Sequence, residues 1–423
     1  IMTRLGSFRN IAIVSGSTGA SRVLGLIRDV LLYAGLGASV WTSAFILAFS
    51  LPNLFRRLLG EGAMTSALVP VLSGVMHQEG QSAAFGFFSN VVRRMFLILL
   101  ILTLGGVLLL RWLTQSADLS ERWLLGAQLS VYLLPYLLFI CLSAIFSAGL
   151  NVMGRFATAA AMPSVLNLCM IGSIGGALLC RQTPEAIVYW LCVGVLIGGA
   201  IQLLLPIVNF AGLGWRLNTR ATSDAPMKEL RSLFVPALAG AAILQINILV
   251  SRLLAHGLNE SAVSVLYLAS RLMELPLGLF TIAVATVFFP MMAEALSRSD
   301  TDTFARNFAS GMRLVFAISV PAGIGLIILG GPIVELLRFG HFAATDAEIV
   351  VGLVALYGAG LPFYSLATFS TRGLHAAKLI RCTVRIAGIC LIINLLGSLL
   401  MMQFWAEYGL AAANAFAALI QSI

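Results

Sequence analysis

The sequence contains few charged residues. They make up 10% of its 423 positions, whereas an average soluble protein has about 25%. Lysine is especially rare and occurs only at Lys228 and Lys378, while hydrophobic residues make up 60% of the chain. A chain with so few charges cannot cover a soluble domain of any size with a polar surface. The composition therefore predicts a polytopic, all-α membrane protein.

Several chemical signatures are also absent. The six cysteines lack C-x-x-C spacing and fall mostly in apolar runs, which is typical of buried thiols rather than of disulfides or a metal site. The four histidines are isolated, and no G-x-x-x-x-G-K-[ST] phosphate loop occurs. A membrane-embedded transferase acting on a polyprenyl diphosphate would add acidic pairs for Mg²⁺, and the sequence has none. These absences favour a transporter without metal or cofactor over an enzyme.

Apolar windows of about 20 residues are long enough to cross a bilayer. The second and eighth windows are longer than a straight span needs and contain internal prolines, including Pro52 and Pro276, so we expect both to be kinked or broken there. We read twelve windows in the chain: 10–34, 40–72, 84–112, 122–150, 157–180, 184–213, 230–257, 260–296, 304–330, 346–375, 379–405 and 408–423.

The basic residues indicate an orientation rather than a nucleic-acid partner. The net charge is +9, but arginines are scattered singly in short loops and form no basic patch. Most fall on one predicted face, with the N-terminus, and the positive-inside rule places that face in the cytoplasm. The basic residues of this face are Arg4, Arg9, Arg93, Arg94, Arg155, those within 216–231, Arg298, Arg306 and those within 378–385.

The most polar stretch divides the predicted spans into six and six. We expect an N-terminal six-helix lobe at 1–214, a cytoplasmic linker at 215–229 and a C-terminal lobe at 230–423. The last window is cut short at Ile423, so we expect a truncated final helix and a longer full protein.

The two halves resemble each other in sequence. A shift of 224 residues places Gly16 on Gly240, Arg28 on Arg252, Pro52 on Pro276 and Gly149 on Gly373. Six spans per repeat is an even number, so both halves would enter the membrane the same way round, as a parallel repeat. In such transporters the substrate site lies between the halves near mid-membrane. Chance matches of Gly, Leu and Pro in apolar sequence are the alternative.

Charges inside predicted spans cluster in the first two spans of each repeat. The stretch LPNLFRRLLGEG at 51–62 is the clearest case; on a regular helix its Arg57 and Glu61 are spaced i, i+4 and can pair. A charge at bilayer depth costs about 3 kcal/mol, so it faces a bundle interior or a wet cavity. Arginines snorkelling to headgroups, or salt bridges between helices, are the alternatives. The intramembrane charges are Arg22, Arg28, Arg56, Arg57, Arg252 and Arg271 against Asp29, Glu61 and Glu274.

The excess of arginine favours an anionic substrate. A guanidinium donates two parallel hydrogen bonds to a phosphate or diphosphate. A cation-coupled drug exporter would need carboxylates in dry positions instead. Ser43, Asn53 and Ser270 are secondary candidates for the site.

With these residues in view, the chain resembles the MurJ/MviN family, the lipid II flippases of bacterial cell-wall synthesis. SRVLGLIRD at 21–29 is similar to the family's first-helix motif, and AFSLPNLFRRLLGEGA at 48–63 is similar to its second-helix motif. SRLMELPLG at 270–278 is similar to the eighth-helix motif. The segments NVMGRFATAAAMPSVLN at 151–167 and RFGHF at 338–342 also fit, so the resemblance covers essentially the whole chain.

The resemblance implies two six-helix lobes around a cationic cavity. It implies alternating access that moves a lipid-linked disaccharide-pentapeptide between the leaflets of the bacterial cytoplasmic membrane. It also implies that Arg22, Arg28, Arg56 and Arg271 bind the diphosphate, with Asp29 near Arg28. Lipid II, membrane lipid and the cell-wall synthesis machinery are the implied partners. Family members have two further helices that are absent here.

The chain departs from the family pattern at carboxylate positions. Ser43 and Ser270 stand where the family usually has Asp, and 372–383 lacks the aromatic residue, acid and proline that usually follow its Arg-Gly. A sodium site built on carboxylates in the eleventh span is unsupported, because 379–405 contains none. Three readings stay open: a lipid II flippase, a same-fold flippase or exporter for another lipid-linked saccharide or organic ion, and a membrane scaffold with a degenerate cavity.

Overall fold

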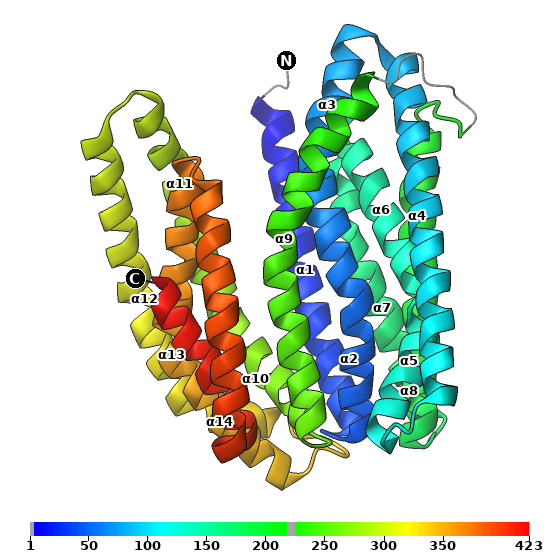
Figure 1. Ribbon diagram of the computed structural model, residues 1–423, viewed down its shortest axis with the longest axis vertical. Helices are drawn as coiled ribbons and strands as arrows, with labels where there is room; N and C mark the ends of the chain where they lie inside the picture. Colours follow the sequence, from blue (N-terminus) through cyan, green and yellow to red (C-terminus); the bar gives the residue numbers. More distant parts are fainter. Residues whose placement is uncertain (1–3, 218–224, 423) are drawn as a thin grey trace. The chain divides into compact units, whose positions relative to one another are not determined.

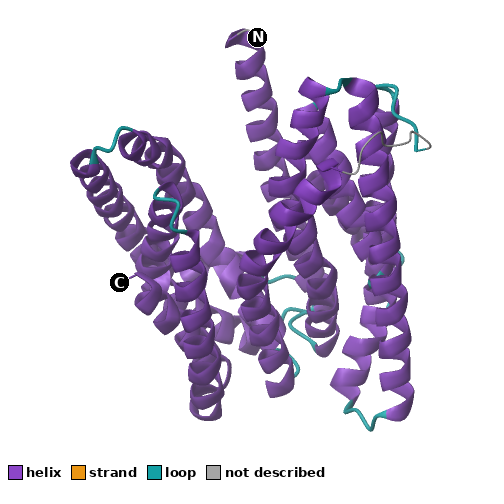
Figure 2. Cartoon of the chain, turned by 45° about the horizontal axis from the view of Figure 1, so that its top comes forward, coloured by secondary structure: helices purple, strands orange, loops and turns teal. Residues whose placement is uncertain are grey.

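The chain folds into long helices, as its apolar windows predict. The computed structural model describes residues 4–217 and 225–422, and within them all side chains except those of 4–15, 60–62, 239–240, 244 and 380. Every regular element in these residues is a helix, and short loops join them (Figure 2). The prediction of an all-α fold is therefore confirmed.

Two π-helical segments, η1 and η2, interrupt the α-helices. In chain order the elements are α1 (Arg4–Leu36), α2 (Val40–Phe55), η1 (Arg56–Met64), α3 (Thr65–Gln78), α4 (Gln81–Ser116), α5 (Glu121–Leu133), α6 (Pro135–Val152), α7 (Phe156–Leu179), α8 (Pro184–Ala211), α9 (Ala225–Leu258), α10 (Ala262–Pro276), η2 (Leu277–Thr281), α11 (Ile282–Ser297), α12 (Thr301–Leu336), α13 (Ala344–Ala376) and α14 (Ile380–Ser422).

Local signals set where several helices start and stop. Gly37 follows the last residue of α1 with φ +66°, a left-handed conformation that glycine adopts without a Cβ penalty. Thr183 caps α8 by accepting a hydrogen bond from the amide of Ala186, and Pro184 occupies the first helical position, where its missing N–H costs nothing. These residues fix the short loops that return the chain across the bundle.

Nine helices in the described part of the chain are long and apolar enough to cross a membrane, so the protein is a multi-pass membrane protein. The predicted spans 379–405 and 408–423 run together as α14, but the helix is broken at Trp405 and Ala406, where φ changes to −127° and +47°. The helix α1 and the run from α2 to α3, which carry the intramembrane charges of the N-terminal half, are not among the nine. The twelve-span count stays a prediction.

Both proline-containing long spans are broken, as predicted. η1 begins four residues after Pro52, and η2 begins directly after Pro276. A π-helix pairs residues i and i+5, so each residue turns through a smaller angle than on an α-helix. Arg57 and Glu61 both lie within η1, where residues four apart still fall on nearly the same face. The Glu61 side chain is not among the described side chains, so the pairing of these two residues stays a prediction.

Packing divides the chain into two units, unit 1 (Ile1–Leu36 and Ala44–Gln245) and unit 2 (Gly37–Ser43 and Ile246–Ile423). In unit 1, α7 packs between α1 and α8, and α6 packs against both α4 and α8 (Figure 1). One end of its core is an aromatic cluster in which edge-to-face contacts predominate. The cluster consists of Phe85, Phe88, Phe146, Phe210 and Trp215.

In unit 2, α12 packs closely along α13, and both contact α11 (Figure 1). Their backbones touch where Gly323 of α12 meets the carbonyl oxygen of Gly358 in α13. Small residues allow such close approach, which gives van der Waals contact between membrane helices. The same carbonyl receives no hydrogen bond from residue 362 of its own helix, because Pro362 has no N–H.

A similar proline effect occurs inside unit 1. Pro206 in α8 cannot donate to the carbonyl of Gln202, and the hydroxyl of Ser143 in α6 donates to that carbonyl at 2.6 Å instead. The Gln202 side chain donates to the carbonyl of Met162 in α7 at 2.6 Å. These buried hydrogen bonds join three helices in a region where water cannot satisfy the backbone.

Structural features recur at equivalent positions of the two sequence repeats. A Cβ at Gly149 would meet the ring of Phe88 in α4, and a Cβ at Gly373 would meet the ring of Phe308 in α12. Each ring belongs to the third predicted span of its own half, as each π-helix belongs to the second. Gly240 lies outside the residues whose side chains are described. The recurrence supports the repeat on grounds of packing as well as sequence.

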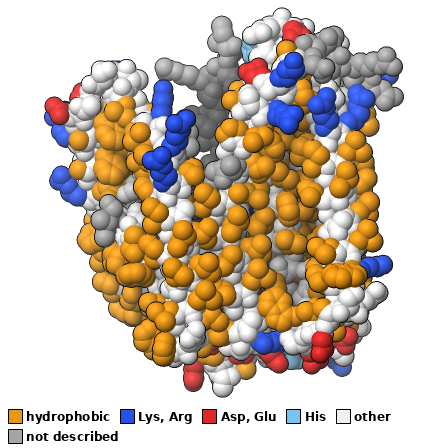
Figure 3. Space-filling view, in the orientation of Figure 1, with side chains coloured by type: hydrophobic (Ala, Val, Ile, Leu, Met, Phe, Trp, Pro, Cys, Tyr) orange, Lys and Arg blue, Asp and Glu red, His pale blue; other side chains and the backbone are white. Residues whose placement is uncertain are grey.

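The exterior of the helices is strongly apolar. Exposed side chains of α4 include Ile101, Leu104 and Leu108, which are 69%, 53% and 67% exposed. On the face of unit 1 seen in Figure 3, apolar side chains cover the middle of the helices and charged side chains gather towards their ends. Such a belt matches a hydrocarbon layer between two polar interfaces.

Candidate anion-binding site

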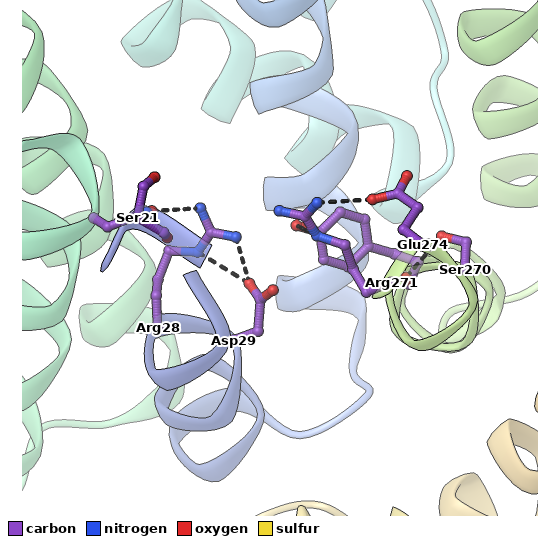
Figure 4. A network of polar contacts seen from close by, with 8 residues as sticks. Ser21, Arg28, Asp29, Ser270, Arg271 and Glu274 are labelled. Carbon is purple, nitrogen blue, oxygen red and sulfur yellow. Dashed lines mark hydrogen bonds and ion pairs between the residues drawn. The ribbon is translucent and has the colours of Figure 1, made fainter. Parts of the chain in front are cut away.

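The first span holds a buried ion pair. Arg28 and Asp29 in α1 are 7% and 5% exposed, and the guanidinium donates to the same carboxylate oxygen from Nη2 at 2.6 Å and from Nε at 2.9 Å. Nη1 donates to the side-chain oxygen of Asn167 in α7 at 3.0 Å. Asn167 in turn donates from Nδ2 to the carbonyl of Ser21 at 3.0 Å. Figure 4 shows Arg28, Asp29 and Ser21 of this network.

This network fixes Arg28 firmly within unit 1. All three of its nitrogens donate to protein oxygens, and one of its partners lies on another helix. A buried charge without a partner would cost several kcal/mol, and Asp29 neutralises it. Arg28 is therefore held in one orientation before any ligand arrives, which lowers the entropy cost of binding an anion.

The second span places its arginines differently. Arg56 is half-buried and donates from Nε to the side-chain oxygen of Asn53 at 3.2 Å, whereas Arg57 is exposed. Asn53 itself donates to the carbonyl of Phe49 at 3.2 Å. The Glu61 side chain lies outside the described side chains. The structure thus brings two predicted site residues, Asn53 and Arg56, into direct contact.

In unit 2, Arg271 pairs with Glu274 on α10. Nη1 donates to the Glu274 carboxylate at 2.9 Å, and both side chains are close to half-exposed (Figure 4). Nε donates to the phenol oxygen of Tyr267 at 3.2 Å. The guanidinium carbons of Arg271 and Arg252 lie 5.5 and 5.9 Å from the centre of the Tyr267 ring. Two arginines from two helices thus lie within cation–π distance of one aromatic ring.

The remaining predicted site residues lie as follows. Ser43 is fully buried, and its hydroxyl accepts a hydrogen bond from the amide of Ser264 at 3.3 Å. Ser270 is half-buried and donates to the carbonyl of Tyr267 at 2.8 Å. Arg22 is exposed. Both serines are therefore engaged with the backbone.

Sequence reasoning missed two residues of these networks, Asn167 and Tyr267. Asn167 ends a motif that supported the family resemblance, and a buried amide in an apolar helix is itself a signal. Tyr267 precedes Arg271 by four residues, which places both on one face of α10. Neither signal identifies the partner, because the contacts with α7 and α9 are not visible in the sequence.

The eleventh predicted span contains no carboxylate, and its buried polar side chains are neutral. Asn394 of α14 donates to Asn247 at 2.7 Å and to Ser251 at 3.4 Å, both in α9. Asn394 and Ser398 are each 1% exposed. Within the part of the chain that the structure describes, the Asn394 side-chain oxygen and the Ser398 hydroxyl have no hydrogen-bond partner. This contact joins helices without any net charge.

The helical architecture is similar to that of a solved membrane transporter. The structure matches the inward-facing conformation of a multidrug resistance MATE family transporter of the MOP superfamily with a TM-score of 0.76, over 95% of this chain and 92% of that chain. The sequence identity is 10%, so this likeness concerns the fold alone. Fold and apolar exterior together define a polytopic, all-helical membrane protein.

Closer comparisons give the family. The family model of lipid II flippase MurJ matches residues 33–423. A probable lipid II flippase MurJ of Rhizobium tropici is 31% identical over 97% of this chain and 78% of its own length. A structure of lipid II flippase MurJ in an inward closed conformation matches with a TM-score of 0.83 and 26% identity, over 97% of this chain and 85% of that one. The chain belongs to the lipid II flippase MurJ family.

Proposed function

We propose that this chain flips lipid II, the lipid-linked disaccharide-pentapeptide precursor of peptidoglycan, by alternating access. The observation that carries the proposal is the family match along 33–423, together with arginines at the motif positions Arg28, Arg56 and Arg271. Their guanidinium groups have the charge and the paired donors that a diphosphate requires. Arg22, Arg57 and Arg252 complete the proposed set of cations.

The proposal includes the location of the protein. We place it in the bacterial cytoplasmic membrane with the N-terminus in the cytoplasm, because most arginines fall on that side of the predicted spans. The lobes 1–214 and 230–423 would move relative to each other, with Pro52 and Pro276 as hinges. The π-helices that follow both prolines support this role, because π-helical turns are frequent at functional sites. Cell-wall synthesis enzymes are the proposed protein partners.

Complementation tests the substrate class. In cells depleted of their own lipid II flippase, we expect the full-length gene to restore growth and Arg28→Ala or Arg271→Ala to abolish rescue. Arg111→Ala is the matched control, because Arg111 is exposed at the end of α4 and should leave rescue intact. Protein levels in the membrane are measured for every variant. Rescue by both Arg28→Ala and Arg271→Ala would overturn the proposed anion site.

A second candidate is a same-fold flippase or exporter for another lipid-linked saccharide or an organic ion. Ser43 and Ser270 favour it, because hydroxyls replace two carboxylates that the family usually has. Failure of the wild-type chain to rescue, with the protein present in the membrane, would support this candidate. The double variant Ser43→Asp/Ser270→Asp tests whether the missing carboxylates account for the failure. Rescue by this variant would show that these two positions cause the change of substrate.

A further inference from the structure

Tyr267 lies where the two proposed anion-binding arginines of unit 2 meet. It is half-buried on α10, one helical turn before Arg271. Its ring centre lies 5.5 Å from the Arg271 guanidinium carbon and 5.9 Å from that of Arg252 on α9. The phenol oxygen accepts a hydrogen bond from Nε of Arg271 at 3.2 Å. One side chain therefore contacts both cations.

Two guanidinium groups that approach the same ring carry like charges and repel each other. An aromatic ring offsets this repulsion, because its negative face attracts a cation on either side. The phenol contributes further by fixing the Nε edge of Arg271, while Glu274 engages Nη1. Tyr267 thus holds the position of Arg271 and the spacing of Arg271 from Arg252.

We propose that Tyr267 is a positioning residue that makes Arg252 and Arg271 a paired site for a diphosphate. The inference rests on the proposed function and extends it to specificity. A diphosphate offers one phosphoryl group to each guanidinium, whereas a monophosphate engages fewer of the fixed donors. Tyr267 therefore sets the preference of this pair for diphosphate over monophosphate lipids without itself carrying charge.

The test uses purified full-length protein and two soluble probes, farnesyl diphosphate and farnesyl monophosphate. Tyr267→Phe keeps the ring and removes the acceptor, and we expect diphosphate affinity to fall about threefold. Tyr267→Leu removes both contacts, and we expect a fall of about tenfold or more, with monophosphate affinity changing less than about twofold. The ratio of diphosphate affinity to monophosphate affinity should thus be highest in wild type, lower in Tyr267→Phe and lowest in Tyr267→Leu.

Tyr364→Phe is the matched control. Tyr364 is a phenol of α13 in the same unit, and its hydroxyl is buried without a partner among the described residues. We expect this variant to keep the wild-type ratio. If Tyr267→Leu fails to fold, Tyr267→Phe and the salt dependence of its diphosphate binding decide the question. A loosened arginine pair should make diphosphate affinity fall less steeply with salt concentration than in wild type.

Flipping of lipid II in proteoliposomes is measured in parallel to separate the two proposals. Flipping by wild type together with an unchanged ratio in both Tyr267 variants would overturn the positioning role and leave the proposed function standing. Equal loss of both probe affinities would also overturn it, since that result indicates general disruption. Absence of flipping by the wild-type chain would overturn the proposed function instead.

Discussion

At the scale of single residues, the buried Arg28–Asp29 pair is the best-defined feature of the proposed site. A polar residue inside a membrane protein is expensive and usually functional. Here the cost is offset by three hydrogen bonds from the guanidinium and by the link of Asn167 back to the Ser21 carbonyl. The pair is neutral as a unit, so any anion that binds at Arg28 must compete with Asp29.

Removing Asp29 should destabilise the protein more than removing Asn167. Asp29→Ala leaves a buried guanidinium without its counter-ion, for which we expect a loss of about 3–5 kcal/mol. Asn167→Ala removes one neutral acceptor, and the expected loss is about 1–3 kcal/mol. Thermal unfolding of the detergent-solubilised variants measures both. A smaller effect for Asp29→Ala than for Asn167→Ala would show that the ion pair is not what stabilises this region.

At the scale of helices, close backbone contacts replace the hydrophobic driving force that water supplies to soluble proteins. The crossing of α12 and α13 at Gly323 and Gly358 is the clearest example. The π-helices after Pro52 and Pro276 interrupt the regular α-helical hydrogen bonding of two other spans. The molecule thus combines tightly packed helix pairs with two interrupted spans.

Gly323→Ala should separate α12 from α13. The added Cβ meets the Gly358 carbonyl, which is backbone and cannot move aside, so we expect a loss of about 1–3 kcal/mol in unfolding free energy. Gly325→Ala is the control, since nothing lies within 4 Å of its Cβ position. Alanine there should be neutral or stabilise α12 by up to about 1 kcal/mol. Equal melting temperatures for the two variants would contradict the close crossing.

The start of α12 should be sensitive to acid. Asp300 caps this helix and accepts a hydrogen bond from the amide of Thr303 at 2.9 Å. Hydrogen bonds from the side chain and then the backbone of Thr303 hold the pKa of Asp300 below its ordinary value of 3.8. A lowered folded-state pKa means that the cap stabilises the helix fully above pH 3.8 and loses this effect as the pH falls through the folded-state value.

Amide hydrogen exchange measures the protection that this cap gives to the first turn of α12. We expect Asp300→Ala to expose the first-turn amides of α12 near neutral pH, and the difference from wild type to vanish in strong acid. Asp302→Ala is the comparison, because Asp302 lies exposed in the same turn and affects only the helix dipole. A difference between Asp300→Ala and wild type that persists unchanged at low pH would show that the carboxylate is not the source of protection.

At the scale of the whole molecule, the two sequence repeats carry comparable polar links. Asn167 of the fifth predicted span bonds to Arg28 of the first, and Asn394 of the eleventh bonds to Asn247 of the seventh. The first link is charged and the second is neutral. The N-terminal half therefore holds a charged link between its first and fifth predicted spans, and the C-terminal half holds a neutral one.

Natural cysteines offer a test of orientation. Cys180 follows α7 and Cys382 lies near the start of α14; both are exposed and fall on opposite predicted faces. If the N-terminus is cytoplasmic, a membrane-impermeant maleimide should label Cys180 in intact cells and Cys382 only after the cytoplasmic membrane is permeabilised. Cys180→Ser and Cys382→Ser assign the two signals. The reverse pattern would invert the proposed topology.

Much of this architecture could be predicted from the sequence. Hydropathy alone determined that the chain is a helical, multi-pass membrane protein, because only helices and closed barrels satisfy backbone groups in lipid. Pro52 and Pro276 located the two interrupted spans, because proline removes a helix hydrogen bond at a known position. The charges in the first two spans of each repeat located the candidate site, because such charges are costly elsewhere.

The tertiary structure alone decided what each charge contacts. The π-helical geometry around Arg57, the contact of Arg28 with Asn167 and the meeting of Arg252 and Arg271 at Tyr267 all depend on helices far apart in the sequence or on strain along one helix. Hydrophobic periodicity determines that a helix forms and that it is buried. It does not determine the register at which two helices touch, because that register is set by side-chain packing and paired hydrogen bonds between them.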